Sequence, residues 1–179
     1  MGEDLLFNLD YLKVCQNICV VNESLYNYIL FNNTNSLTGS YKNDFFENQQ
    51  MLFQKVREFL MENNSYKGKN KDYIEISYTT SIIGCFSNLF HKNSNLTSVD
   101  IKGQIHKIIF SREVRKDIIY FKSGSFQKQI IGYLIKIKSI NGINYFMKTK
   151  NFLRYKLRPF FNVLKTINNK RTLENEVDK

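Results

Sequence analysis

Two adjacent carboxylates, Glu3 and Asp4, are the residues of this chain best placed for acid–base chemistry. They stand at the start of a leucine-rich segment, Leu5 to Cys15, whose spacing predicts a helix. A carboxylate in the first helical turn is held by the backbone and stays ionised beside the positive end of the helix dipole. Such a group can act as a general base, and a neighbouring carboxylate can tune it. The pair can equally do no more than cap the helix, because acidic residues are common at helix starts.

Metal ligation and thiol chemistry find little support in the sequence. The two histidines, His91 and His106, have no partner at the spacing of a metal site. The three cysteines, Cys15, Cys19 and Cys85, include no Cys-x-x-Cys pair, and their odd number does not suit a disulfide framework. We therefore expect reduced thiols and no metal held by protein ligands.

The elements that must position the two carboxylates are a helix and a short strand. Helical leucine spacing extends from Asp4 to Gln16, and the β-branched segment Ile18 to Val21 predicts a strand. The clearest helix of the chain then runs from Asp44 to Met61, where Asp44 and Glu47 have the spacing of a capping box.

The remainder of the chain predicts further helices. They are expected at Lys71 to His91, Ser98 to Phe110, Ser111 to Phe121, Phe126 to Ser139 and Ile143 to Ile167. The β-branched content of Lys71 to His91 would also suit strands, but its length favours a helix. The segment from Ser98 to Phe121 can form two helices or one bent helix. Asn141-Gly142 is the signature of a turn between the last two predicted helices.

The positive charge of the chain lies away from the two carboxylates. Residues 1–64 hold 8 acidic and 4 basic side chains, whereas residues 65–179 carry a net charge of +14. Basic and aromatic residues interleave from 143 to 170, which suits an anionic membrane surface. The same pattern suits aromatic side chains that face a core beneath a solvated lysine surface, or a nucleic-acid partner.

Five short segments of the first 40 residues follow a definite order. They are Gly2-Glu3-Asp4, Leu6-Phe7-Asn8-Leu9, Ile18-Cys19-Val20-Val21, Leu25-Tyr26-Asn27-Tyr28 and Asn35-Ser36-Leu37-Thr38. This order resembles the acceptor-side end of the catalytic domain in bacterial family 2 glycosyltransferases of the GT-A fold. It is similar to the subgroup that builds capsular, cell-wall and lipopolysaccharide glycans. The resemblance covers Gly2 to Ser40 and becomes generic from Asp44 to Phe121.

By this resemblance, Asp4 is the general base of an inverting sugar transfer, and Glu3 supports it or contacts the acceptor. The implied substrates are a nucleotide sugar and a glycan or lipid-linked acceptor, at the cytoplasmic side of the plasma membrane. The family's nucleotide-binding strands and Asp-x-Asp metal motif precede the Glu-Asp pair, and no Asp-x-Asp occurs in these 179 residues. A Mn or Mg ion and the nucleotide sugar would then bind outside this chain, and we expect the chain alone to be inactive.

Together these patterns predict a mainly α chain with three parts. Residues 1–40 would be the end of a GT-A domain, residues 41–142 a helical accessory region, and residues 143–179 a basic amphipathic tail. In the transferase, the helical region would shape the acceptor site, mediate self-association or contact the membrane. The alternative is a non-enzymatic basic helical module that docks on a partner protein, an anionic membrane or nucleic acid. Nucleic acid is the partner favoured least, because no helix-turn-helix, RNP-like or zinc motif is present.

Overall fold

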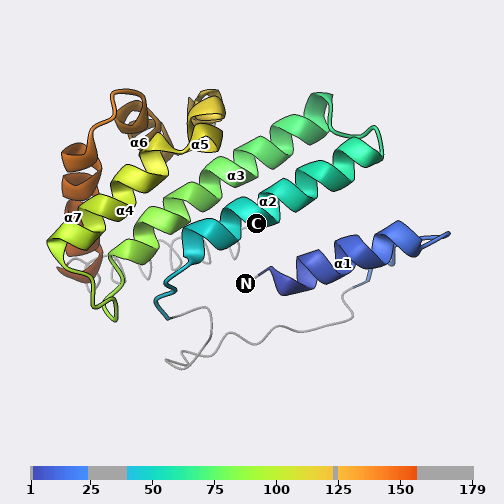
Figure 1. Ribbon diagram of the computed structural model, residues 1–179, viewed down its shortest axis with the longest axis horizontal. Coiled ribbons are helices and arrows are strands. Elements are labelled where there is room, and N and C mark those ends of the chain that lie inside the picture. Colours follow the sequence, from blue (N-terminus) through green and yellow to red (C-terminus); the bar gives the residue numbers. More distant parts are fainter. Residues whose placement is uncertain (1, 24–39, 123–124, 157–179) are drawn as a thin grey trace, which may run out of the picture.

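The computed structural model describes residues 2–23, 40–122 and 125–156 (Figure 1). These residues form a mainly α structure, as the sequence predicts, and contain no β-strand. The elements are α1 (Glu3–Val14), α2 (Phe45–Glu62), α3 (Gly68–Leu89), α4 (Ser98–Phe110), α5 (Arg112–Lys116), the 3₁₀ helix η2 (Ile118–Lys122), α6 (Phe126–Lys136) and α7 (Ile140–Lys156).

Helices α2 and α3 lie side by side as an antiparallel pair at the centre of the molecule (Figure 1). Just after the end of α2, Asn64 adopts the left-handed conformation, with φ 54°. The N–H of Ser65 then donates to the carbonyl of Leu60 at 2.7 Å. This arrangement satisfies the last carbonyls of the helix and reverses the chain within a few residues. Helix α3 then returns along α2 and brings its buried face against the remaining helices.

The core lies where α3 meets α4, η2, α6 and α7. Its fully buried side chains come from every one of these elements: Tyr78, Ile82, Phe86, Ile105, Ile108, Ile109, Phe121, Ile131, Ile135, Ile143 and Met147. Aliphatic and aromatic residues at i, i+3, i+4 and i+7 give each helix the apolar face that such packing requires. Ile143 and Met147 belong to the predicted basic tail, so the described part of that tail, up to Lys156, packs its apolar face in the core.

The capping box predicted at Asp44 and Glu47 is not formed. Asp44 has φ −98° and ψ 33° and makes no capping hydrogen bond, because its backbone is not in the extended conformation that an N-cap requires. A capping box forms instead at Thr97 and Asp100, where the Asp100 N–H donates to Thr97 Oγ1 at 3.2 Å and the Thr97 N–H donates to Asp100 Oδ2 at 2.9 Å. It begins α4.

The predicted turn at Asn141-Gly142 is also wrong, because both residues lie in the first turn of α7. The chain reverses earlier, at Lys138, whose φ of 55° places it in the left-handed region. Gly142 has a packing role instead. A Cβ at this position would lie 2.6 Å from Ser139 Oγ and 2.7 Å from Leu134 Cδ2, so a larger residue would have to displace these two side chains where α7 meets the end of α6.

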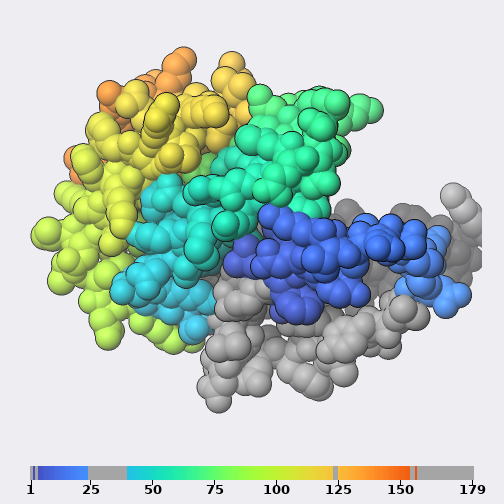
Figure 2. All heavy atoms as spheres, turned by 45° about the vertical axis from the view of Figure 1, so that its right-hand side comes forward, coloured from blue at the N-terminus to red at the C-terminus, as the bar shows by residue number. Residues whose placement is uncertain are grey.

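Helix α1 lies on the outside of the bundle against α2 (Figure 2). The strand predicted at Ile18 to Val21 is not formed, since no described segment offers a strand edge with which it could pair. Ile18, Val20 and Val21 are instead exposed. The described part of residues 1–40 is therefore one helix followed by an irregular segment.

Candidate functional site

Gly2 places the start of α1 directly on α2. Its φ of 105° belongs to the left-handed region, which favours glycine, and its carbonyl accepts from the Leu6 N–H at 2.9 Å. A Cβ at Gly2 would lie 2.9 Å from Leu52 Cδ2. The glycine of the Gly-Glu-Asp segment thus starts the helix and lets it approach α2.

Asp4 lies in the first turn of α1 with its side chain exposed. Glu3 begins the same helix, but its side chain lies outside the part of the chain that the structure describes. An ion pair of 3.0 Å between Lys13 and Glu62 also joins α1 to α2, and Leu9 of α1 is buried. Asp4 therefore presents its carboxylate to solvent, where an external hydroxyl could reach it.

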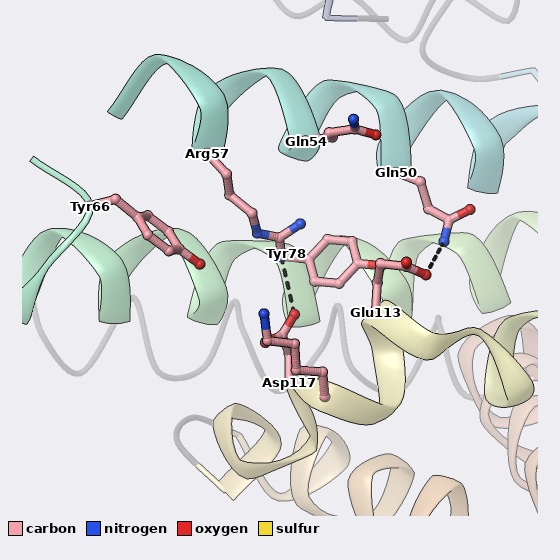
Figure 3. A pocket seen from close by; sticks show the side chains of 8 residues that line it. Gln50, Gln54, Arg57, Tyr66, Tyr78, Glu113 and Asp117 are labelled. Atoms are coloured by element: carbon pink, nitrogen blue, oxygen red, sulfur yellow. Dashed lines mark hydrogen bonds and ion pairs between the residues drawn. The ribbon is translucent and has the colours of Figure 1, made fainter. Parts of the chain in front are cut away.

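A buried charge cluster joins α2, α3 and the end of α5 on another side of the bundle. Figure 3 shows two of its members, Arg57 and Asp117. The guanidinium of Arg57 donates to both oxygens of Glu75, at 2.8 Å from Nε and 2.5 Å from Nη2. It also donates from Nη2 to Asp117 Oδ2 at 3.1 Å. The hydroxyl of Tyr66 donates to Glu75 as well. Glu75 has no exposed surface, so one cation and one hydroxyl satisfy a fully buried carboxylate.

The two carboxylates of this cluster have opposite pKa shifts. Burial opposes the ionisation of Glu75, but hydrogen bonds from Arg57 and Tyr66 outweigh it and lower its pKa. Burial, and then the neighbouring Glu75 carboxylate, raise the pKa of Asp117 to about 6. Asp117 therefore keeps a proton to higher pH than Glu75 does. Arg57 therefore pairs with an ionised Glu75 at ordinary pH, and with an ionised Asp117 only above about pH 6.

A pocket of about 440 Å³ opens beside this cluster. The side chains that line it are Gln50, Gln54, Arg57, Tyr66, Tyr78, Glu113, Lys116 and Asp117. At one end, Gln50 Nε2 donates to Ser111 Oγ at 2.9 Å and to Glu113 Oε2 at 3.3 Å. The ring of Tyr78 lies between Arg57 and Glu113 in Figure 3, with Arg57 Cζ 4.6 Å from the ring centroid.

Tyr78 is the unusual member of this group. It has no exposed surface, and its hydroxyl has no hydrogen-bond partner among the described residues. Burial raises the pKa of this hydroxyl, which therefore remains a neutral donor at every ordinary pH. The pocket thus contains one buried polar group that the surrounding protein leaves unsatisfied.

The sequence prediction missed this cluster because its members are 18 and 60 residues apart and form no motif. One feature of the sequence could have indicated the cluster. Glu75 shares a helical stripe with Tyr78 and Ile82, at i, i+3 and i+7, so an acidic residue stands on an otherwise apolar face. A buried acid of this kind requires a cation from another element.

Lys128 of α6 is a second buried charge. Its Nζ donates to the carbonyl of Ile76 at 3.0 Å and to Thr80 Oγ1 at 3.3 Å, and burial lowers its pKa. These contacts tie α6 to the middle of α3. Since both acceptors are neutral, the lysine serves here as a cross-link between helices.

No protein-family model matches the chain. Neither the curated proteins nor the solved structures contain a match. Of the residues that the structure describes, none forms a group of three or more His, Cys, Asp and Glu side chains suited to a metal ion. The described helices also include none with the length and apolar character needed to cross a membrane.

Proposed function

We propose that this chain supplies the acceptor-side end of an inverting glycosyltransferase of the GT-A fold. The reaction transfers a sugar from a nucleotide-sugar donor to a glycan or lipid-linked acceptor, in cell-surface polysaccharide synthesis at the cytoplasmic face of the plasma membrane. The observation that carries the proposal is the start of α1, where Gly2 fixes the helix on α2 and Asp4 faces solvent. That arrangement agrees with the Gly-Glu-Asp segment of family 2 enzymes.

Exposed apolar side chains support the same proposal. Phe7, Tyr11 and Val14 on α1 are 69%, 60% and 76% exposed, and the segment that follows exposes Ile18 and Val20 as well. A contiguous group of large exposed apolar residues is typical of a surface that another part of a protein covers. The remainder of a GT-A domain, in a longer polypeptide, would cover it.

The role of Asp4 follows from the chemistry of inverting transfer. Its carboxylate accepts the proton of an acceptor hydroxyl while the oxygen attacks the anomeric carbon, and the nucleoside diphosphate leaves from the opposite face. The described residues offer no set of ligands for the divalent ion that the family uses, and we derive no step through that ion. In this proposal, an Asp-x-Asp motif outside the chain holds the metal and the diphosphate.

Sugar transfer by a polypeptide that carries a GT-A donor-binding half before Gly2 tests the proposal. Asp4→Asn should lower kcat by about 10²- to 10⁴-fold, the usual contribution of a general base, with little change in KM for the donor. Asp10→Asn, an exposed acid on the same helix, is the matched control and should retain full activity. If the Asp4 variant transfers sugar as fast as the control, Asp4 is not the base.

A second candidate is a non-enzymatic basic module, because the helices α2 to α7 share one core and residues 65–179 carry the positive charge. Co-sedimentation with vesicles that contain anionic lipid tests this function. A truncation after Lys156 is the suitable comparison, because it keeps Ile143 and Met147 in the core. Salt-sensitive binding that is lost on truncation would support membrane docking through the tail. Binding of neither form would exclude it.

A further inference from the structure

The polar pocket and Asp4 lie on different faces of α2. Gln50, Gln54 and Arg57 follow one another at i, i+4 and i+7, so they line one side of the helix. Leu52, which contacts Gly2 of α1, stands two positions after Gln50 and is rotated by about 200° from it. The pocket is therefore a separate site, and an inference about it does not rest on the role of Asp4.

The unsatisfied hydroxyl of Tyr78 is the first indication of a ligand. Buried polar groups almost always have a hydrogen-bond partner, and an unpaired one opposes folding. Phenylalanine would fill the same space without an unpaired hydroxyl. Tyr78 is one of the residues that line the pocket, and a ligand whose hydrogen-bonding group displaces the side chains around this buried hydroxyl would give it a partner.

The charge of the pocket wall indicates a neutral ligand. Two cations, Arg57 and Lys116, stand with two carboxylates, Glu113 and Asp117, and the Arg57 guanidinium is already bound by Glu75 and Asp117. A free anion would meet two carboxylates at this wall, and a free cation would meet an arginine and a lysine. The charges of the wall therefore favour neither an anion nor a cation as the ligand.

The hydrogen-bonding groups of the wall suit hydroxyl groups. Carboxylate oxygens of Glu113 accept, the ammonium of Lys116 donates, and the amide of Gln54 does both. A sugar hydroxyl also donates and accepts at once, so a polyol can match such a mixture at several points. The half-buried ring of Tyr66 adds an aromatic surface for the apolar face of a sugar ring. A volume of about 440 Å³ is in the range of small-ligand pockets.

We propose that this pocket binds a neutral polyhydroxylated ligand with the size of one or two sugar rings, and that Tyr78 donates a hydrogen bond to it. Glu113 and Gln54 hold further hydroxyls, and Gln50 orients Glu113 through its 3.3 Å hydrogen bond. The pocket would thus recognise a saccharide on the opposite face of α2 from α1.

The test is a titration of the full ¹⁵N-labelled chain with glucose, galactose, N-acetylglucosamine and lactose, followed by NMR. At least one of these sugars should shift the side-chain amide signals of Gln50 and Gln54 in a saturable manner. Tyr78→Phe should weaken that binding by about tenfold, as the loss of one buried hydrogen bond predicts, without lowering the thermal unfolding midpoint. Tyr73→Phe, an exposed tyrosine on the same helix, is the matched control and should bind as the wild type does.

Three results would overturn the proposal. The first is that none of the four sugars shifts the glutamine amides at 20 mM, a concentration on the order of ten times a weak millimolar Kd. The second is equal affinity in the Tyr78 and Tyr73 variants. The third is a lower unfolding midpoint for Tyr78→Phe without sugar binding, which would mean that water satisfies the hydroxyl. The titration reports binding beside Gln50 and Gln54, whereas sugar transfer tests the catalytic proposal, so failure of the pocket and failure of the catalytic proposal are distinguishable.

Discussion

Helix α1 and the bundle formed by α2 to α7 are attached and stabilised in different ways. In α1, Leu9 is the one large apolar residue that the structure describes as buried, whereas Phe7, Tyr11 and Val14 are exposed. The bundle has a continuous core and a fully buried ion cluster. Its helices need each other to bury their apolar faces, and α1 depends mainly on α2.

This difference separates the two chemical features of the molecule. The carboxylate that resembles a catalytic base lies on the loosely attached helix, where solvent and an external substrate can reach it. The buried charges of Arg57, Glu75 and Asp117 lie in the rigid bundle, where they hold three elements together beside a pocket. The proposed base and the proposed binding pocket thus lie in different regions of the chain, one on an exposed helix and the other in the bundle.

The largest effect that distinguishes the regions is expected from their ion pairs. Arg57→Met keeps much of the apolar stem but leaves Glu75 buried without its cation, so it should lower the free energy of unfolding by about 3–5 kcal/mol. Lys13→Met, which removes the α1–α2 ion pair, should cost less than about 1 kcal/mol because both partners of that pair are about half exposed. Urea unfolding followed by circular dichroism measures both variants. Equal losses would mean that α1 is integrated as tightly as the bundle.

A smaller effect is expected from pH. The pKa of Asp117 is raised in the folded state to about 6, so the folded state binds this proton more tightly than the unfolded state does. Its contribution to stability is therefore complete below about pH 4 and is lost as the pH rises through about 6. The lowered pKa of Glu75 acts in the opposite sense, since its contribution is lost only as the pH falls below the ordinary range of a glutamate. The cluster should be most stabilising between these two limits.

Asp117→Asn isolates the part that Asp117 contributes. An asparagine can accept from Arg57 and, like the protonated acid, carries no negative charge, so the variant should not lose stability between pH 5 and pH 7.5. The wild type should lose about 1–2 kcal/mol over the same range. Urea unfolding at four pH values in this interval measures the difference. Parallel pH profiles for the two proteins would show that another group is responsible.

The elements that the sequence predicts well are those whose apolar spacing alone determines their packing. Helix α2 follows from the face that carries Phe46, Leu52 and Val56, and the long α3 follows from its length and apolar content. Capping was harder to predict. Asp44 with Glu47 and Thr97 with Asp100 have the same spacing, and only the backbone conformation of the first residue decides which pair forms a box.

The candidate sites could be predicted only in part for a related reason. Asp4 could be proposed from the sequence because its signal is local, a pair of acidic residues at a helix start within a segment that resembles a known family, and its catalytic role stays a prediction. The pocket depends on contacts between residues that are far apart in sequence, such as Arg57 with Asp117. The prediction of a strand at Ile18 to Val21 was wrong because strand formation also depends on distant residues. A β-branched segment becomes a strand only where another strand edge is present.

Amide hydrogen exchange of the intact chain is the most direct test of the division between α1 and the bundle. Because α1 has few buried contacts, it should open without the rest of the fold, and its hydrogen-bonded amides should exchange on the order of a hundredfold faster than those of α3 and α4. Protection of α1 equal to that of α3 and α4 would contradict the account, because it would show that all of these helices unfold together as one unit.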